Sequence, residues 1–136
     1  MKKLLIIPDR NNLADSLEIA EKYGTGFEYN DFFVPSVLDS KKKVDRIAEE
    51  YKSVHLPEYC TSHGAFFDVI PFSLDERIKE ISDLRIQQSI AAAEKVGARA
   101  VVFHTNYNPF LNSEAYINSF VETNAAYWGH VLRQHK

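Results

Sequence analysis

The chain has few of the features that mark disulfide-rich, nucleotide-binding or membrane proteins. Cys60 is the single cysteine among 136 residues, which excludes an internal disulfide framework and fits a reducing compartment. No Gly-x-Gly-x-x-Gly or P-loop pattern follows the first apolar run, so a nucleotide site gains no support. That run, residues 4–7, stops at Pro8 and is far too short for a signal sequence or a membrane span. We therefore expect a cytoplasmic protein that does not enter the membrane.

The sequence also lacks an excess of positive charge. Sixteen basic and 19 acidic residues give a net charge of -3 at pH 7. Most lysines and arginines are mixed with acids, so no basic stripe is available to follow a nucleic-acid backbone. The run Lys41–Lys43 is interpreted as the solvated start of a helix, with an anion site as the alternative. We expect no nucleic-acid partner.

Short apolar segments alternate with longer amphipathic segments along the whole chain, without a linker or low-complexity tract. The short segments predict strands over 4–7, 26–29, 58–62 and 100–103. Apolar residues at helical spacing predict helices over 13–23, from Asp39 or Ser40 to 51, over 73–97, and from a cap at Ser113 to 132. Strands joined by helices must run parallel, because each helix carries the chain back over the sheet. The sequence thus predicts an α/β fold of four βα units, forming one domain over residues 1–136.

The βα pattern is clearest from Arg99 to Pro109. The run 100–103 is continuously apolar, as in a strand buried on both faces, and His104 begins the polar loop after it. His63 similarly ends the third predicted strand, and Ser73 with Glu76 forms a capping box that predicts the start of the helix after it. Parallel sheets place ligand sites at the carboxyl ends of their strands. We therefore expect His63 and His104 to be site residues.

Several segments resemble motifs of the xylose isomerase-like TIM barrel superfamily. Residues 61–67, Thr-Ser-His-Gly-Ala-Phe-Phe, resemble its third-strand motif, and Val-Phe-His at 102–104 after Gly-Ala-Arg at 97–99 resembles its fourth-strand motif. Gly-Phe-Glu at 26–28 is similar to a second-strand segment of the isomerase branch, and the alanine-rich end of the third helix is similar to the helix before the fourth strand. The resemblance covers essentially the whole chain. It implies the N-terminal half of a parallel (βα)8 TIM barrel.

Four βα units leave such a barrel incomplete, since a closed one has eight units and typically about 250 residues. An open half has two unpaired strand edges and an uncovered inner face. Three situations remain open: a truncated gene, a half-barrel that pairs with a second copy, or a split protein whose C-terminal half is a separate chain. We expect a homodimer or pairing with a C-terminal half-barrel.

The resemblance implies a divalent-metal-dependent sugar or sugar-phosphate isomerase or epimerase. This chain contains part of that enzyme, and the activity is expected of the complete form. The metal, Mn, Mg, Zn or Co, would be held mainly by the absent C-terminal half, and the reaction is proton transfer next to a carbonyl. His63 and His104 are then catalytic, orienting substrate or assisting proton transfer. The superfamily's endonuclease IV branch implies an alternative, an apurinic-site phosphodiesterase in which both histidines bind metal. A third reading is a non-catalytic half-barrel that serves assembly or binding.

Four further residues are predicted to contact the sugar. Glu28 ends the second strand, either as a ligand-orienting acid or as a structural acid paired with a base such as Arg99. Phe33 and Phe66 lie in aromatic loops after the second and third strands, where rings stack on a sugar, fill a core or face a partner. Asn106 binds a sugar hydroxyl or serves only the turn before Pro109.

Overall fold

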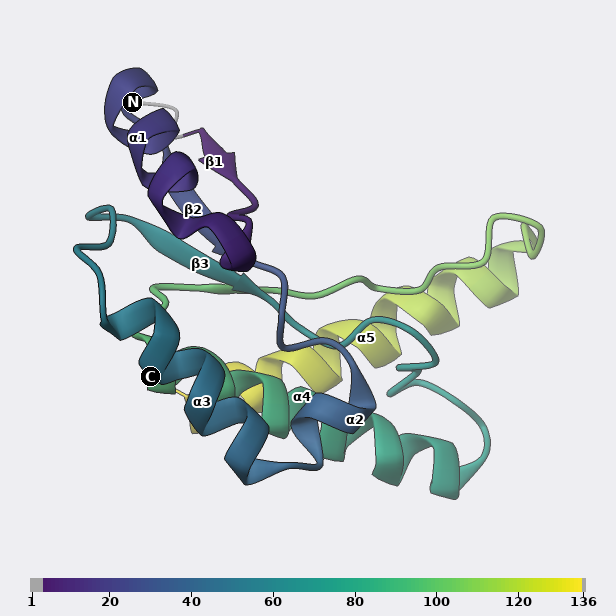
Figure 1. Ribbon diagram of the computed structural model, residues 1–136. Helices are drawn as coiled ribbons and strands as arrows, with labels where there is room; N and C mark the ends of the chain where they lie inside the picture. The colour runs from purple at the N-terminus through teal and green to yellow at the C-terminus, as the bar shows by residue number, and fades with distance from the viewer. Residues whose placement is uncertain (1–3, 136) are drawn as a thin grey trace. The chain divides into compact units, whose positions relative to one another are not determined.

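The computed structural model describes residues 4–135, which divide into two compact units. The first unit is built from the residues up to Phe67 together with Arg85–Phe103. The second unit is built from Asp68–Leu84 together with the residues after Phe103. Figure 1 shows the helices and strands of both units and labels most of them.

The first unit contains a four-stranded parallel sheet, which confirms the predicted α/β class (Figure 1). The strands lie in the order β1 (Leu5–Ile6), β2 (Gly26–Tyr29), β3 (Cys60–His63) and β4 (Val101–Val102). The edge strands are shorter than the sequence predicts. The prediction that residues 100–103 are buried on both faces is wrong, since Val102 is 40% exposed. The run 100–103 is as apolar as an internal strand, but β4 lies at an edge of the sheet.

One face of the sheet packs against helices. Phe27 and Tyr29 of β2 are fully buried, and the Tyr29 ring lies 4.4 Å, centroid to centroid, from that of Tyr51. Tyr51 belongs to α3 (Lys41–Lys52), which also buries Ile47 and Ala48. Ser40 caps this helix by accepting a hydrogen bond from the Lys43 N–H, as the predicted start requires. The tyrosine pair therefore joins β2 to α3.

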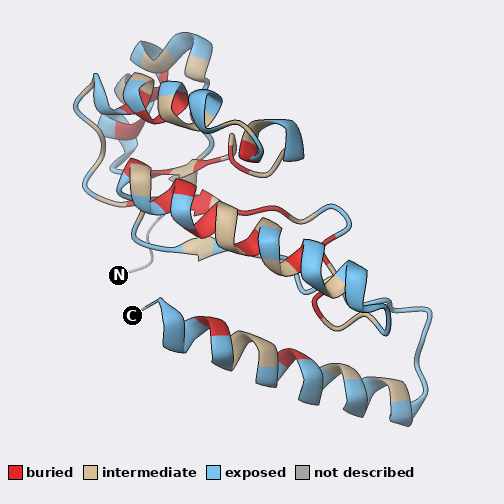
Figure 2. Ribbon diagram, turned by 90° about the horizontal axis from the view of Figure 1, so that it is seen from below, coloured by how far each residue is buried: buried red, intermediate tan, exposed pale blue. Residues whose placement is uncertain are grey.

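Three more helices contribute to the first unit. A 3₁₀ turn (η1, Arg10–Asn12) precedes α1 (Leu13–Tyr23), which ends at Gly24 with a φ of 61°. The sequence does not predict the one-turn helix α2 (Pro35–Leu38), because four residues are too few to show a periodicity. Only the later part of α4 (Glu76–Val96) belongs to this unit, and it buries residues at helical spacing, Ile86, Ser89, Ile90, Ala93 and Val96. Figure 2 shows how buried positions concentrate in the strands and along this part of α4.

The predicted start of α4 is wrong by two residues. A capping box with Ser73 as the cap would begin the helix at Leu74, but the helix begins at Glu76. Asp75 Oδ1 accepts a hydrogen bond from the Arg77 N–H at 2.9 Å, and Ser73 Oγ accepts one from the Asp75 N–H at 3.1 Å. Asp75 is as good a cap as serine and lies nearer the apolar run, so it takes the capping position.

The second unit is formed around α5 (Glu114–Gln134), which Ser113 caps by accepting from the Tyr116 N–H. Phe120 of this helix packs edge-on against Phe72 at 4.7 Å and against Tyr107 at 5.1 Å. None of the helices within residues 4–135 has both the length and the hydropathy that crossing a bilayer requires.

Replacing Gly129, in the interior of α5, should stabilise the chain. A Cβ there would meet only the Arg133 Nη1 at 3.5 Å, an ordinary contact. Alanine also restricts the unfolded chain, so Gly129→Ala should raise the free energy of unfolding by about 0.5–1 kcal/mol in urea titrations. Gly97→Ala serves as the opposite control, since Gly97 has a φ of 74° and its replacement should cost about 1 kcal/mol. A loss of stability in Gly129→Ala would contradict the placement of residue 129 in a helix interior with room for a Cβ.

Candidate functional site

Three polar side chains share the sheet face opposite the one that packs on α3. Side chains alternate along a strand, so Glu28 points away from the face that buries Phe27 and Tyr29. Glu28 is in register with Thr61 on the adjacent strand, roughly 4.8 Å away along the hydrogen-bonding direction. His63 is two residues after Thr61, on the same face at the carboxyl end of β3. We call Glu28, Thr61 and His63 the polar row.

Thr61 holds a buried hydroxyl without a hydrogen-bond partner among the described residues. An unpaired buried hydroxyl is unfavourable, so this position suits a hydroxyl or water that arrives from outside the chain. Sequence reasoning missed Thr61, because threonine is an ordinary strand residue. The available signal was its position two residues before His63 on the same strand face.

The ring of His63 is oriented by its own loop. Its Nδ1 lies 3.0 Å from the carbonyl oxygen of Gly64. A carbonyl only accepts, so the hydrogen of this bond belongs to Nδ1, and in the neutral ring Nε2 is then the acceptor. His63 therefore presents a nitrogen that can take a proton or accept a hydrogen bond from a hydroxyl.

Three phenyl rings gather beside His63 and form what we call the aromatic cluster: Phe33, Phe66 and Phe67. The Phe66 ring lies 5.2 Å from Phe33, 4.1 Å from Phe67 and 5.0 Å from the imidazole of His63, centroid to centroid. Phe33 follows β2 and the other two follow β3. The structure thus brings two predicted substrate contacts, Phe33 and Phe66, together with a predicted catalytic residue. Their contact with a sugar stays a prediction.

Ser89 of α4 holds the two loops that carry this cluster. Its hydroxyl accepts a hydrogen bond from the Ala65 N–H at 3.0 Å and lies 3.5 Å from the carbonyl oxygen of Phe32. Ala65 immediately precedes Phe66, and Phe32 immediately precedes Phe33. Sequence reasoning missed Ser89, and its signal was a serine inside an otherwise apolar helix stripe.

An ionic network ties the loop after β1 to the loop after β2. Arg10 donates from Nε to Asp31 at 3.0 Å and from Nη1 to Glu50 at 2.6 Å, and the Tyr51 hydroxyl donates to Asp31 at 2.6 Å. The bond to Glu50, and after it the contact with Asp31, holds the pKa of Arg10 above its usual range. Arg10 is thus engaged by carboxylates of its own chain, which supports the loop that carries Phe33.

Tyr51 makes the free energy of unfolding depend on pH in the alkaline range. Burial, and next the hydrogen bond to Asp31, raises the pKa of Tyr51 well above its usual value of about 10. Above that pH the unfolded chain loses a proton that the folded chain keeps, so the free energy of unfolding falls as pH rises. The free energy of unfolding from urea titrations should therefore decrease above about pH 10, with a slope near 1.4 kcal/mol per pH unit from this one group. Tyr51→Phe should have the shallower slope, and equal slopes would contradict this origin.

His104 and Asn106 belong to the second unit, whereas His63 belongs to the first. His104 follows β4 after one residue and is exposed. The proximity of the two histidines therefore stays a prediction. Asn106 has a φ of 52° and donates from its amide to the Val69 carbonyl at 2.6 Å, so this side chain joins two loops of the second unit. Its predicted contact with a sugar is likewise untested.

The described residues contain no group of three or more histidine, cysteine, aspartate or glutamate side chains placed to hold a metal ion. The polar row offers two such ligand types, Glu28 and His63, on one sheet face. These residues by themselves do not fit the divalent metal that the resemblance implies. Cys60 could supply a thiolate ligand, but it is buried and its thiol donates to the Pro57 carbonyl at 3.3 Å.

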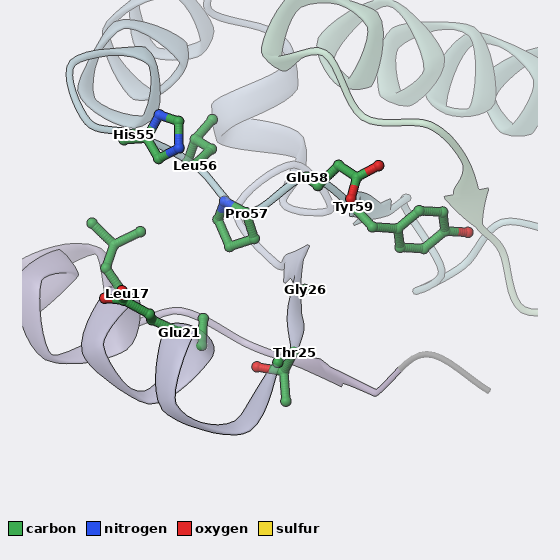
Figure 3. A pocket seen from close by; sticks show the side chains of 11 residues that line it. Leu17, Glu21, Thr25, Gly26, His55, Leu56, Pro57, Glu58 and Tyr59 are labelled. Atoms are coloured by element: carbon green, nitrogen blue, oxygen red, sulfur yellow. The ribbon is translucent and has the colours of Figure 1, made fainter. Parts of the chain in front are cut away.

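A pocket of about 660 Å³ lies at the other end of the strands, between α1 and the segment that leads into β3 (Figure 3). Residues 24–26, which lead into and begin β2, and residues 55–59, which precede β3, form much of its wall. In barrels of parallel strands the amino-terminal end serves stability and the carboxyl-terminal end carries the chemistry. We therefore place the candidate site at the polar row and the aromatic cluster, away from this pocket.

Comparison of the sequence with protein-family models and with curated proteins gives no match. Two solved structures are similar in fold. A D-tagatose 3-epimerase-like protein has a TM-score of 0.66 and 20% identity, over 97% of this chain and 48% of its own. The TTHB071 protein from Thermus thermophilus, soaked with ZnCl2, has a TM-score of 0.58 and 17% identity, over 78% of this chain and 40% of its own.

The chain therefore spans less than half the length of each of these two structures. Identities of 17% and 20% establish the fold and not the activity. The parallel sheet with its strands in sequential order agrees with this likeness. The chain has the fold of one half of a parallel (βα)8 barrel.

Proposed function

We propose that this chain supplies half of the active site of a sugar or sugar-phosphate isomerase or epimerase. The observation that supports it is the polar row, which ends in the aromatic cluster at the carboxyl end of the sheet. Glu28 and Thr61 are in register, and the ring centroids of His63 and Phe66 lie 5.0 Å apart. A polar strip beside apolar rings matches the two sides of a sugar, its hydroxyls and its C–H surface.

The groups in the row have distinct tasks in this proposal. His63 Nε2 removes a proton from the carbon next to the sugar carbonyl or returns it, as a general base and acid. The Glu28 carboxylate and the Thr61 hydroxyl hold neighbouring sugar hydroxyls by hydrogen bonds. The aromatic cluster covers the sugar and keeps water from the carbon that exchanges its proton.

The comparisons support the proposal only in outline. One structure of similar fold is described as D-tagatose 3-epimerase-like, and this chain spans 48% of it. Catalysis in our proposal therefore needs a second half-barrel. A divalent metal would take its principal ligands from that half, since the residues described here do not form a three-ligand group.

Proton exchange next to a carbonyl tests this function directly. The purified chain is incubated in D2O with ketoses and their phosphates, with and without Mn²⁺, and deuterium entering next to the carbonyl is followed by NMR. We expect exchange with at least one sugar and a loss of about 100-fold or more in His63→Ala. The matched control is His55→Ala, since His55 lies in the wall of the pocket at the other end of the strands.

His55→Ala should exchange at the wild-type rate. Wild-type exchange that survives His63→Ala unchanged contradicts the role of His63. Absence of exchange with every sugar, also when the chain is dimeric, contradicts the proposed function.

A further inference from the structure

The two outer strands each present one backbone edge that has no strand partner within residues 4–135. The Leu4 carbonyl accepts from the Gly26 N–H at 2.9 Å, and the Val102 carbonyl accepts from the Gly64 N–H at 2.9 Å. Backbone groups of successive strand residues point to opposite sides, so those of Leu5 and Val101 point away from the sheet. The sheet thus ends in two parallel edges, one at β1 and one at β4.

The first and last helices also carry apolar side chains in solvent. Ile19 and Tyr23 of α1 are 45% and 65% exposed, although they stand one helical turn apart on the same face. On α5, Ile117, Val121 and Leu132 are 38%, 58% and 67% exposed. We call these two sets the α1 patch and the α5 stripe.

The α5 stripe borders the buried side of that helix, and Ile117, seven residues before Asn124, lies nearest to that side. Phe120 packs on Phe72 within the second unit, and Asn124 and Val131 are buried on the same side of the helix. Val121 and Leu132 each follow a residue of the buried side by one position, about 100° further around the helix. Figure 2 shows α5 largely exposed along its length. A helix whose apolar side extends beyond its buried side is suited to a second partner.

We propose that a second copy of this chain closes the barrel, with β4 of each copy pairing in parallel with β1 of the other. The two open edges differ, since β1 is followed along the chain by the α1 patch and β4 is followed by the α5 stripe. Joining two copies at both edges about a two-fold axis gives eight parallel strands and leaves no edge unpaired. The chain spans 48% of the D-tagatose 3-epimerase-like protein, so two copies supply the length of that structure.

Closure also brings two copies of the proposed half-site together. A two-fold barrel places two copies of the polar row and two aromatic clusters around one mouth, at the carboxyl ends of all eight strands. This consequence rests on the proposed function, whereas the interface itself does not. A dimer without proton exchange would refute the function and leave the interface standing.

Mass and amide exchange test the interface on the unaltered protein. Light scattering on a sizing column should give twice the 15.6 kDa of one chain, and dilution should return the single mass. Hydrogen exchange should show the Leu5 and Val101 amides protected in the concentrated sample and exchanging in the dilute one. A monomer at all concentrations, an open-ended series of larger masses, or unprotected Leu5 and Val101 amides in a dimer would each overturn the proposal.

Two variants locate the contact. Val101→Pro removes the outward N–H but leaves the bonds from β3, which involve the carbonyls of Ala100 and Val102. Val121→Lys places a charge in the α5 stripe and should raise the dissociation constant of the dimer by about tenfold or more. Ser119→Lys, exposed on the opposite side of α5, adds the same charge and should leave it unchanged. If circular dichroism shows that Val101→Pro does not fold, the test is the comparison of Val121→Lys with Ser119→Lys. Equal dimer dissociation constants for these two variants would overturn the proposal.

Discussion

Gly26→Ala should lower the free energy of unfolding by about 3 kcal/mol or more. A Cβ on Gly26 would lie 2.0 Å from the backbone carbonyl oxygen of Tyr59, which no side-chain rotation can relieve. Relief requires β2 to move away from β3. Gly26 donates to the Leu4 carbonyl at 2.9 Å, and the Phe27 N–H donates to Tyr59 at 3.2 Å, so that movement strains both ladders of β2. Urea denaturation followed by circular dichroism measures the loss.

Gly24→Ala separates this steric effect from the general cost of replacing a glycine. Gly24 ends α1 with a φ of 61°, and a Cβ there would meet no atom within 4 Å. Its replacement should cost only about 1 kcal/mol, from backbone strain alone. Equal losses in the two variants would mean that the close approach of β2 and β3 at Gly26 is not what holds the sheet.

The sequence was most informative where a segment's chemistry is local. Residues 26–29 were predicted as a strand and form β2 with the same bounds, because their alternation of buried and less buried side chains is visible in four residues. Ser113 caps α5 as predicted, and Ser40, one of the two predicted starts, caps α3, since a cap needs only its own helix. The parallel direction of the strands followed from helical connections of ordinary length.

The sequence was less informative where a residue's role depends on what lies beside it in space. The run 100–103 is as apolar as an internal strand, yet β4 is an edge of two residues. Ile78, Ile81 and Leu84 belong to the apolar spacing that predicts the helix over 73–97, but they are 38–46% exposed. Periodicity shows that a helix has an apolar side and does not show how much of its length is covered.

For the candidate site, the residue types were predictable and their supports were not. His63, Phe33 and Phe66 were identified from their places after strands, and the structure brings them together. Thr61 and Ser89 gave no comparable signal, because single hydroxyls are common in strands and helices. Their importance comes from burial and, for Ser89 with Ala65, from a hydrogen bond across 24 residues of chain.

Ser89→Ala should cost about 2 kcal/mol and loosen the aromatic cluster. The Ser89 hydroxyl accepts from the Ala65 N–H at 3.0 Å and donates to the Arg85 carbonyl at 2.8 Å. Ala65 is buried, so its N–H loses its partner and cannot turn to water. The carbonyl of Arg85 stays in the helix, so most of the lost free energy of unfolding comes from the loop after β3. That loop carries Phe66, and its rearrangement should therefore reach His63.

Two measurements distinguish this positioning role from a general loss of stability. Fluorinated phenylalanine should report a sharper, more mobile Phe66 resonance in Ser89→Ala under conditions where the chain remains fully folded. Ser119→Ala, on the exposed surface of α5, should change stability by no more than about 0.5 kcal/mol and leave that resonance unaltered. Should Ser89→Ala lose stability while Phe66 stays as rigid as in the wild type, the helix would need the serine for packing alone, and the cluster would have to be held by the contacts among its own rings.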